Sequence, residues 1–185
     1  FHAQQPFELF PSGFTACEKG IPINGLIWMG EEQFMLRQIE DKIKAGFDCI
    51  KMKIGAIDFD TEIKLLSGIR KRFSAREITL RVDANGAFLP AEALQKLARL
   101  AELDIHSIEQ PIKAGQWEEM AVLRAETPLP IALDEELIGV FDAQEKQKLL
   151  KIIKPQYIIL KPSLVGGFRG SDTWINLADK QDIGW

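Results

Sequence analysis

The chain has 185 residues, of which 46% are apolar and 27% are charged, a composition typical of a globular domain with a real core. A net charge of −4 gives no basic surface, which argues against nucleic acid and anionic membranes as partners. No apolar run of about 18 residues predicts a membrane span, and Cys17 and Cys49 form no Cys-x-x-Cys pair, which favours a reduced, cytoplasmic setting.

Residues 1–23 contain prolines and glycines that interrupt any regular period, so we predict an irregular linker or arm there. The first residue is not methionine, which suggests that the chain begins partway through a gene product. We expect one folded domain over residues 24–185.

From Asn24 onward, short apolar runs alternate with segments of helical period. In chain order, the first predicted strands and helices are Gly25–Met29, Glu31–Ala45, Cys49–Ile54, Phe59–Phe73, Ile78–Asp83 and Pro90–Ala101. The later ones are Ile105–Glu109, Trp117–Ala125, Pro130–Asp134, Ala143–Ile152, Tyr157–Lys161 and Asp172–Lys180. Each predicted strand is followed by a predicted helix, which favours a parallel sheet with right-handed crossovers.

About six βα units are fewer than the eight of a closed barrel, which typically needs about 250 residues. We therefore predict an α/β fold that is a partial TIM-like (β/α) barrel, with an open doubly wound sheet as the alternative. An incomplete barrel exposes two sheet edges, so we also expect self-association through those edges.

Five ionisable residues stand at the ends of successive predicted strands, 25 to 30 residues apart: Lys53, Asp83, Glu109, Asp134 and Lys161. In a parallel barrel the C-terminal ends of all strands face one mouth, and functional groups gather there. The spacing therefore predicts three carboxylates near one point, with a lysine on either side.

Three carboxylates without histidine or cysteine favour a hard cation over zinc, namely Mg²⁺ with Mn²⁺ as the alternative. The candidate metal ligands are Asp83, Glu109 and Asp134. Alternatively, each carboxylate caps the helix that follows it, which is common at the start of helices. Capping explains any single one of the three equally well, whereas a metal site better explains all three together.

Lys51 and Lys53 are two residues apart on a predicted strand, so their side chains share a face. Burial lowers the pKa of a lysine and neighbouring carboxylates raise it, so the direction of the net shift stays open. Lys161 would address the opposite side of a bound substrate, or pair with a carboxylate such as Asp134. Together these lysines are the candidate proton-transfer groups.

Several polar or small residues lie next to these positions. Arg81 is expected one layer deeper than Asp83, where it would neutralise buried carboxylates. Asn85 and Glu135 are expected to support the ligands or cap helices. The candidate substrate-binding residues after the sixth strand are Ser163, Gly166 and Gly167, and a plain turn is the alternative for the glycine pair.

Five motifs in this order resemble the enolase superfamily in its muconate-lactonising subgroup, over roughly residues 21–182. They are Lys51-Met52-Lys53, Asp83-Ala84-Asn85, Glu109-Gln110-Pro111, Asp134-Glu135 and Lys161-Pro162-Ser163. The resemblance implies the C-terminal barrel of that superfamily, and it implies that residues 1–23 follow a missing N-terminal capping domain. It also implies a small-molecule carboxylate substrate.

The resemblance further implies a role for each charged residue. Magnesium would be held by the three carboxylates, and Lys53 would remove the proton α to the substrate carboxylate. Lys51 would hold the developing charge, and Lys161 would stabilise it from the other face. Superfamily sites of this kind combine a lysine base with magnesium.

Within the subgroup, the RVDANGAF and KPSLVGG stretches are most similar to lyases that eliminate water to form an aromatic acid of menaquinone biosynthesis. Dipeptide epimerases and N-acylamino acid racemases share the same lysines and ligands and remain an alternative. A non-catalytic βα domain that binds a partner, or an inactive fragment, is the second alternative.

Overall fold

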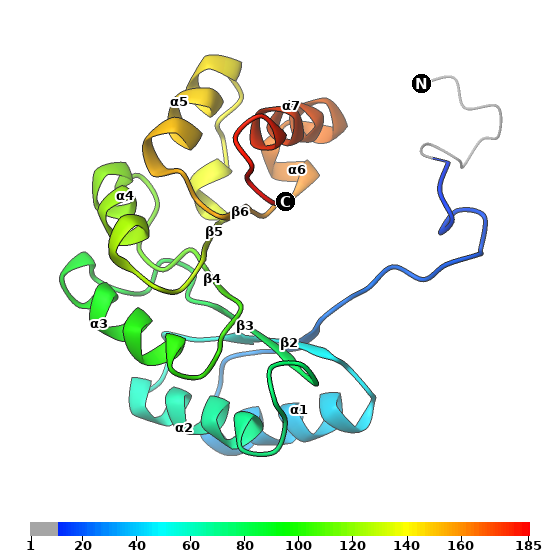
Figure 1. The fold of residues 1–185 in the computed structure, drawn as a ribbon, viewed down its shortest axis with the longest axis vertical. Helices are drawn as coiled ribbons and strands as arrows, with labels where there is room; N and C mark the ends of the chain where they lie inside the picture. The colour runs from blue at the N-terminus through cyan, green and yellow to red at the C-terminus, as the bar shows by residue number, and fades with distance from the viewer. Residues whose placement is uncertain (1–10) are drawn as a thin grey trace.

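The structure is a computed structural model that describes residues 11–185, and the first ten residues of the predicted linker lie outside the described part. Residues 11–23 contain turns but no helix or strand. In Figure 1 this segment leads to the first strand on the open side of the molecule. That the segment links two domains stays a prediction.

Six parallel strands form a single sheet in residues 11–185, and their order in the sheet is their order in the chain. They are β1 (Gly25–Ile27), β2 (Cys49–Lys53), β3 (Thr79–Asp83), β4 (Ser107–Glu109), β5 (Ile131–Leu133) and β6 (Tyr157–Ile158). A doubly wound sheet reverses its strand order partway, so this order confirms the partial barrel over the alternative. Beyond β6, Gly184 forms a single parallel bridge with Tyr157.

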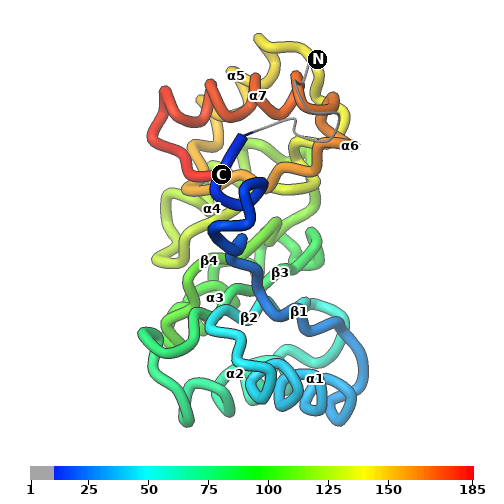
Figure 2. Tube along the Cα trace, turned by 90° about the vertical axis from the view of Figure 1, so that its right-hand side faces the viewer, coloured from blue at the N-terminus to red at the C-terminus, as the bar shows by residue number. Residues whose placement is uncertain are grey.

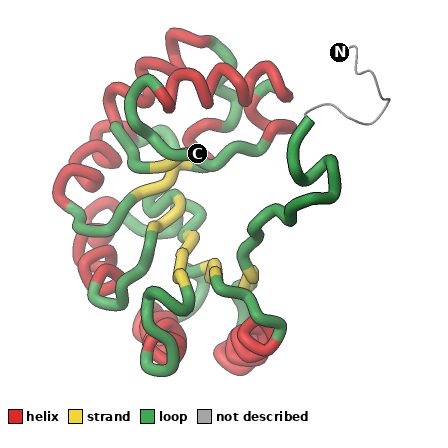
Figure 3. The backbone as a smooth tube through the Cα atoms, turned by 45° about the vertical axis from the view of Figure 1, so that its right-hand side comes forward, coloured by secondary structure: helices red, strands yellow, loops and turns green. Residues whose placement is uncertain are grey.

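The helices follow the strands and cover the convex face of the curved sheet (Figures 1 and 3). They are α1 (Glu32–Lys44), α2 (Phe59–Arg70), α3 (Pro90–Ala101), α4 (Trp117–Glu126), α5 (Ala143–Ile153), α6 (Pro162–Val165) and α7 (Gly167–Asp179), with a 3-10 turn at Glu135–Leu137. No helix within residues 11–185 is both long and apolar enough to cross a bilayer. None of the helices in residues 11–185 covers the concave face, which lies toward the viewer in Figure 2.

The predicted helices agree with the structure within a few residues, except at the last one. That helix begins at Gly167 instead of Asp172, and a single residue separates it from the end of the short helix α6. Gly166 between them has φ +99°, a backbone conformation that glycine adopts readily. The glycine pair looked like a turn in the sequence, and the structure shows a turn only one residue long.

The last strand is also shorter than predicted, with two residues in the ladder instead of five. Tyr157 and Ile158 pair with Ala132 and Leu133 of β5. The chain stays extended after Ile158 and reaches Lys161 before α6 starts. The position of Lys161 therefore depends on one extended segment outside the ladder.

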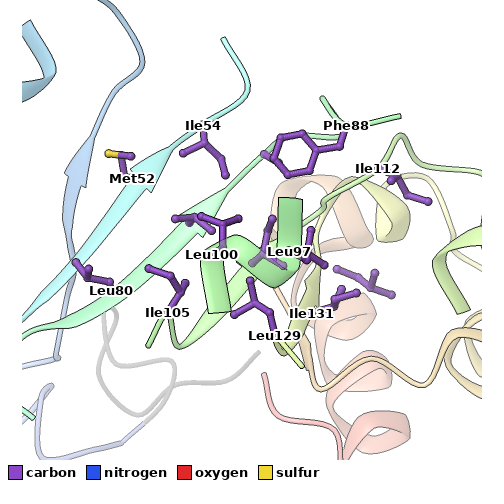
Figure 4. Close-up of a cluster of buried hydrophobic side chains, with 14 of the residues drawn as sticks. Met52, Ile54, Leu80, Phe88, Leu97, Leu100, Ile105, Ile112, Leu129 and Ile131 are labelled. Atoms are coloured by element: carbon purple, nitrogen blue, oxygen red, sulfur yellow. The ribbon is translucent and has the colours of Figure 1, made fainter. Parts of the chain in front are cut away.

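The core lies between the sheet and the helices on its convex face. Along β2 and β3, every second residue points to this side, and Met52 and Leu80 are fully buried there. Leu97 and Leu100 of α3 are equally buried, and Figure 4 shows them packed among these strand residues. Burying each such side chain stabilises the fold by about 1.5–3 kcal/mol, so this layer fixes the strands that carry the polar face.

Candidate active site

The register of the sheet brings the predicted charged residues to one level. Lys53 pairs with Asp83 across β2 and β3, and Asp83 pairs with Glu109 across β3 and β4. On β5, Ala132 pairs with Glu109. Asp134 lies two residues further along the chain, which in a strand returns the side chain to the same face. Four of the predicted residues thus gather at the C-terminal ends of neighbouring strands.

Asp83 is fully buried and contacts two lysines at once. Its Oδ2 atom accepts a hydrogen bond from Lys53 Nζ at 2.6 Å and lies 3.1 Å from Lys51 Nζ. Lys51 Nζ also donates to Glu109 Oε2 at 2.6 Å. The amine of Lys51 therefore bridges the carboxylates of adjacent strands, and both lysines face the concave side, as the two-residue spacing predicts.

Lys161 reaches the cluster from the far end of the sheet. Its amine forms an ion pair with Asp134, whose side chain is buried, while the lysine itself is 43% exposed. Of the two arrangements that the sequence left open for Lys161, the ion pair is present in the structure. Lys161 and Lys53 come from strands at opposite sides of the cluster.

The pKa values of Glu109 and Asp83 shift in opposite directions. Burial raises the pKa of Glu109 to about 7, and the nearby charges of Asp83 and Asp134 add to the rise. Burial also acts on Asp83, but Lys53 and Lys51 outweigh it and lower the pKa of that carboxyl. A further positive charge would therefore stabilise the ionised carboxylates of the cluster.

The same carboxylates determine the direction in which the pKa values of two of the lysines shift. Burial lowers the pKa of Lys51, yet the hydrogen bond to Glu109 and the charge of Asp83 outweigh it, so the net shift is upward. The pKa of Lys161 is likewise raised, because Asp134 outweighs the effect of burial. Both amines therefore act as fixed cations in this arrangement.

Asn85 and Glu135 connect the two halves of the cluster. Asn85 has φ +47° and accepts a hydrogen bond from Lys53 Nζ at 2.8 Å, while its own amide donates to Glu135 Oε1 at 2.9 Å. The backbone N–H of Asn85 donates to Asp83 Oδ1. The second oxygen of Glu135 is buried without a hydrogen-bond partner in the described part of the chain.

Arg81 lies one layer deeper than Asp83, as expected, in register with Lys51 and Ser107. It lines a cavity of about 290 Å³ in the interior of the barrel, together with His106. Within residues 11–185 no ion pair joins Arg81 to the three carboxylates. Lys51 and Lys53 provide the neutralising charge that the sequence suggested for Arg81.

Ser163, Gly166 and Gly167 lie outside this cluster. Ser163 is an exposed residue of α6, and the two glycines form the junction between α6 and α7. No hydrogen bond in the described region links any of the three to the charged residues. Their contact with a substrate stays a prediction.

Three residues for which the sequence predicted no role of their own lie beside the cluster. Gln110 and Glu136 are buried polar residues that hydrogen-bond to each other, and Gln110 also accepts a hydrogen bond from the backbone N–H of Asp134. Trp28 follows β1, and its ring centroid lies 5.9 Å from Lys53 Nζ. A glutamine directly after a candidate ligand, and a third acid directly after Asp134-Glu135, were the only available signals for the first two.

In residues 11–185 there is no group of three acidic, histidine or cysteine side chains whose present arrangement could hold a metal ion. Lysine amines instead pair with the carboxylates, and that of Lys51 lies between Asp83 and Glu109. The donor set nevertheless fits a hard divalent cation, because its oxygens come from adjacent strand ends and Asp83 is fully buried. The unpartnered oxygen of Glu135 and the raised pKa of Glu109 point to the same lack of positive charge.

A sequential parallel barrel with carboxylates and lysines at one mouth defines an α/β-barrel protein with an enzyme-like site. The chain belongs to the family described as Enolase C-terminal domain-like, which matches residues 35–185. It is 58% identical to the o-succinylbenzoate synthase of Desulfotalea psychrophila over 178 residues, which are 96% of this chain and 48% of that protein. It is 31% identical to a hydrophobic dipeptide epimerase of Enterococcus faecalis over 137 residues, 74% of this chain and 37% of the epimerase.

A comparison of the fold with solved structures indicates the same relatives. The crystal structure of MenC from Desulfotalea psychrophila superposes with a TM-score of 0.86 and 57% identity, over 95% of this chain and 48% of that one. The chain thus spans about half the length of the curated relatives it matches.

Proposed function

We propose that this chain forms the catalytic barrel region of an o-succinylbenzoate synthase, a carbon–oxygen lyase that uses Mg²⁺. The observation that carries the proposal is the buried Asp83, which is shared by Lys51 and Lys53 beside Glu109. The 58% identity to a synthase supports the choice of reaction. The substrate would be a small carboxylic acid equal to the product plus one water, and the expected setting is the cytoplasm.

Asp83, Glu109 and Asp134 are the residues that would hold the metal ion, and Mn²⁺ could replace Mg²⁺. When bound, the cation supplies positive charge to the oxygens of a substrate carboxylate, which makes the neighbouring C–H bond more acidic. Asn85 and Glu135 would support this group, because they hydrogen-bond to each other and Asn85 also contacts Lys53 and Asp83.

Lys53 is the proposed base. As a neutral amine it would accept the proton α to the substrate carboxylate, and the electrons of that C–H bond would form the new C=C bond. The β C–O bond breaks as this C=C bond forms, and the hydroxyl departs with the electrons of the C–O bond. The ammonium of Lys53 returns its proton to the departing hydroxyl, so that water leaves. Before it can act as a base, an ammonium of Lys53 must release one proton to the solvent, because only the neutral amine has a free electron pair, and the amine must turn from Asp83 toward the substrate.

Lys51 and Lys161 would remain charged throughout. Their raised pKa values keep both amines protonated, so each can stabilise negative charge that develops on the substrate carboxylate. They approach the cluster from different strands, and the substrate would lie between them.

The direct test is turnover of the hydroxy acid by the complete protein with Mg²⁺, followed by the absorbance of the aromatic product. We expect turnover in the unaltered protein and its loss in Lys53→Ala and Asp83→Asn, with unchanged circular dichroism. Lys64→Ala is the matched control, because that lysine is exposed on α2. A folded, Mg²⁺-loaded protein that leaves the hydroxy acid unchanged would refute the proposal.

Epimerisation or racemisation is the second candidate, because Lys161 and Lys53 lie on opposite sides of the cluster and could exchange protons on two faces of one carbon. In deuterated water, an epimerase incorporates deuterium at the α-carbon from both stereoisomers of a dipeptide or N-acylamino acid. The synthase would instead release its product irreversibly. Deuterium exchange without dehydration would therefore favour the second candidate.

A further inference from the structure

Gln110 is a fully buried residue directly after the proposed ligand Glu109, and its side-chain amide is completely hydrogen-bonded. Its Oε1 accepts from the backbone N–H groups of Asp134 and Glu136, both at 3.2 Å. Its Nε2 donates to Ile112 O at 3.0 Å and to Glu136 Oε2 at 3.1 Å. A glutamine side chain offers two donors and two acceptor positions, so none of its capacity is unused.

The backbone of Gln110 makes two further connections to the strands of the site. Its N–H donates to Ala132 O at 2.9 Å, and its C=O accepts from Gly86 N–H at 2.7 Å. The residue has φ +40°, a left-handed conformation that costs free energy for a residue other than glycine. Gln110 therefore contacts the segments that follow Asp83 and precede Asp134, in addition to its bond to Glu109.

Glu136 determines which way the amide of Gln110 points. Its carboxylate is buried, accepts from Gly115 N–H at 2.8 Å and from Gln110 Nε2, and has no ion-pair partner within residues 11–185. An ionised carboxylate only accepts hydrogen bonds. The NH₂ group of Gln110 must therefore face Glu136, which leaves the amide oxygen to hold the N–H of Asp134.

We propose that Gln110 and Glu136 are positioning residues that fix the backbone of Asp134 relative to Glu109, and so set the spacing of the carboxylates for a divalent cation. The inference rests on the proposed function. Neither residue touches the substrate or the ion in this role. A buried charge without a cationic partner is costly in a plain core, which argues against packing as the reason for Glu136.

The test exchanges the two groups in the complete protein. Gln110→Glu places two carboxylates against each other, and Glu136→Gln places an N–H donor against either Gly115 N–H or the amide of Gln110. The double variant Gln110→Glu/Glu136→Gln restores every bond except the one to Ile112 O and keeps the total charge. Gln147→Glu and Glu119→Gln, both exposed, are the matched controls.

Mn²⁺ affinity is measured without substrate, from the free-ion signal in electron paramagnetic resonance, and urea unfolding is recorded alongside. Groups that orient ligands typically contribute about 10–100-fold to metal affinity, so we expect Gln110→Glu to lower the Mn²⁺ affinity by that factor and Glu136→Gln to lower it less. In the double variant we expect the affinity to recover to within about threefold of the unaltered protein. Should Gln110→Glu fail to fold, Glu136→Gln and the exchange still decide.

Two results would overturn the inference while leaving the proposed function intact. One is an unchanged Mn²⁺ affinity in folded single variants whose unfolding midpoints shift, which is what a purely structural role produces. The other is an exchange variant that binds as weakly as the single variants. Failure of the unaltered protein to bind Mn²⁺ at all would instead remove the proposed function, and this inference with it.

Discussion

The two faces of the sheet differ in chemistry although their residues alternate along the same strands. On β2, Met52 is fully buried against the helices, while its neighbours Lys51 and Lys53 face the concave side and contact carboxylates. On β3, Leu80 and Asp83 differ in the same way. The convex face thus supplies stability and the concave face supplies charge, and each can be altered separately.

The largest expected effect comes from the concave face. Lys53→Ala in the complete protein should lower kcat about 10²–10⁴-fold, the range for loss of a positioned base, while the unfolding midpoint changes little. Steady-state kinetics and urea denaturation measure the two effects. A variant that keeps normal turnover would contradict the division of roles between the faces.

The opposite pattern is expected on the convex side. Leu97→Ala in α3 leaves a cavity in the core and should lower the free energy of unfolding by about 2–5 kcal/mol. The kinetics of the protein that remains folded should be unchanged, because Leu97 packs away from the charged cluster. If kcat falls in the folded fraction, the two faces are not independent.

Glu109 predicts a pH dependence of stability in the protein freed of metal by a chelator. Its folded pKa of about 7 exceeds the ordinary value of 4.5, so the folded state keeps this proton when the unfolded chain has lost it. Stability is then full below about pH 4.5 and falls by up to about 3 kcal/mol as the pH rises to about 7. The lowered pKa of Asp83 acts below 3.8, outside this window.

Glu109→Gln should remove that slope, and Glu119→Gln, an exposed change on α4, should not. Urea denaturation at several pH values between 4.5 and 7 measures it. A slope that persists in Glu109→Gln would place its origin in another group.

The smallest effect is expected at the edge of the concave face. The Trp28 ring lies near Lys53 Nζ, and its backbone is held by two hydrogen bonds of 3.0 Å with Gln38. A cation–π contact at an exposed site contributes about 0.5–1 kcal/mol, so Trp28→Ala should lower kcat/KM about two- to fivefold. Trp28→Phe should recover part of it, and equal values for the two variants would show that the ring does not act on Lys53.

Much of the difference between the apolar convex face and the charged concave face was predictable from local sequence patterns. The predicted helix Pro90–Ala101 has the same bounds in the structure, because Pro90 starts it and its apolar residues repeat with the helical period. The places of Asp83 and Glu109 side by side at neighbouring strand ends also followed from the sequence, since parallel strands end at one mouth. That Asp134 joins them around one cation stays a prediction.

What was missed depends on contacts between distant residues or on unusual backbone. Gln110 has a left-handed backbone conformation and hydrogen-bonds to residues 24 and 26 positions away, which no periodicity reveals. The start of α7 was hidden because Gly166 and Gly167 suggest a turn in any sequence. Arg81 carries a charge suited to the carboxylates, but only side-chain geometry shows that the lysines pair with them.

The central claim is that Asp83, Glu109 and Asp134 hold one divalent cation. Isothermal titration of the complete protein with Mg²⁺, in the absence of substrate, tests it most directly, with Asp134→Asn compared against the exposed Asp172→Asn on α7. We expect one site per chain in the unaltered protein and in Asp172→Asn, and a large loss of affinity in Asp134→Asn. Equal binding by all three proteins, or none by the unaltered one, would contradict the claim.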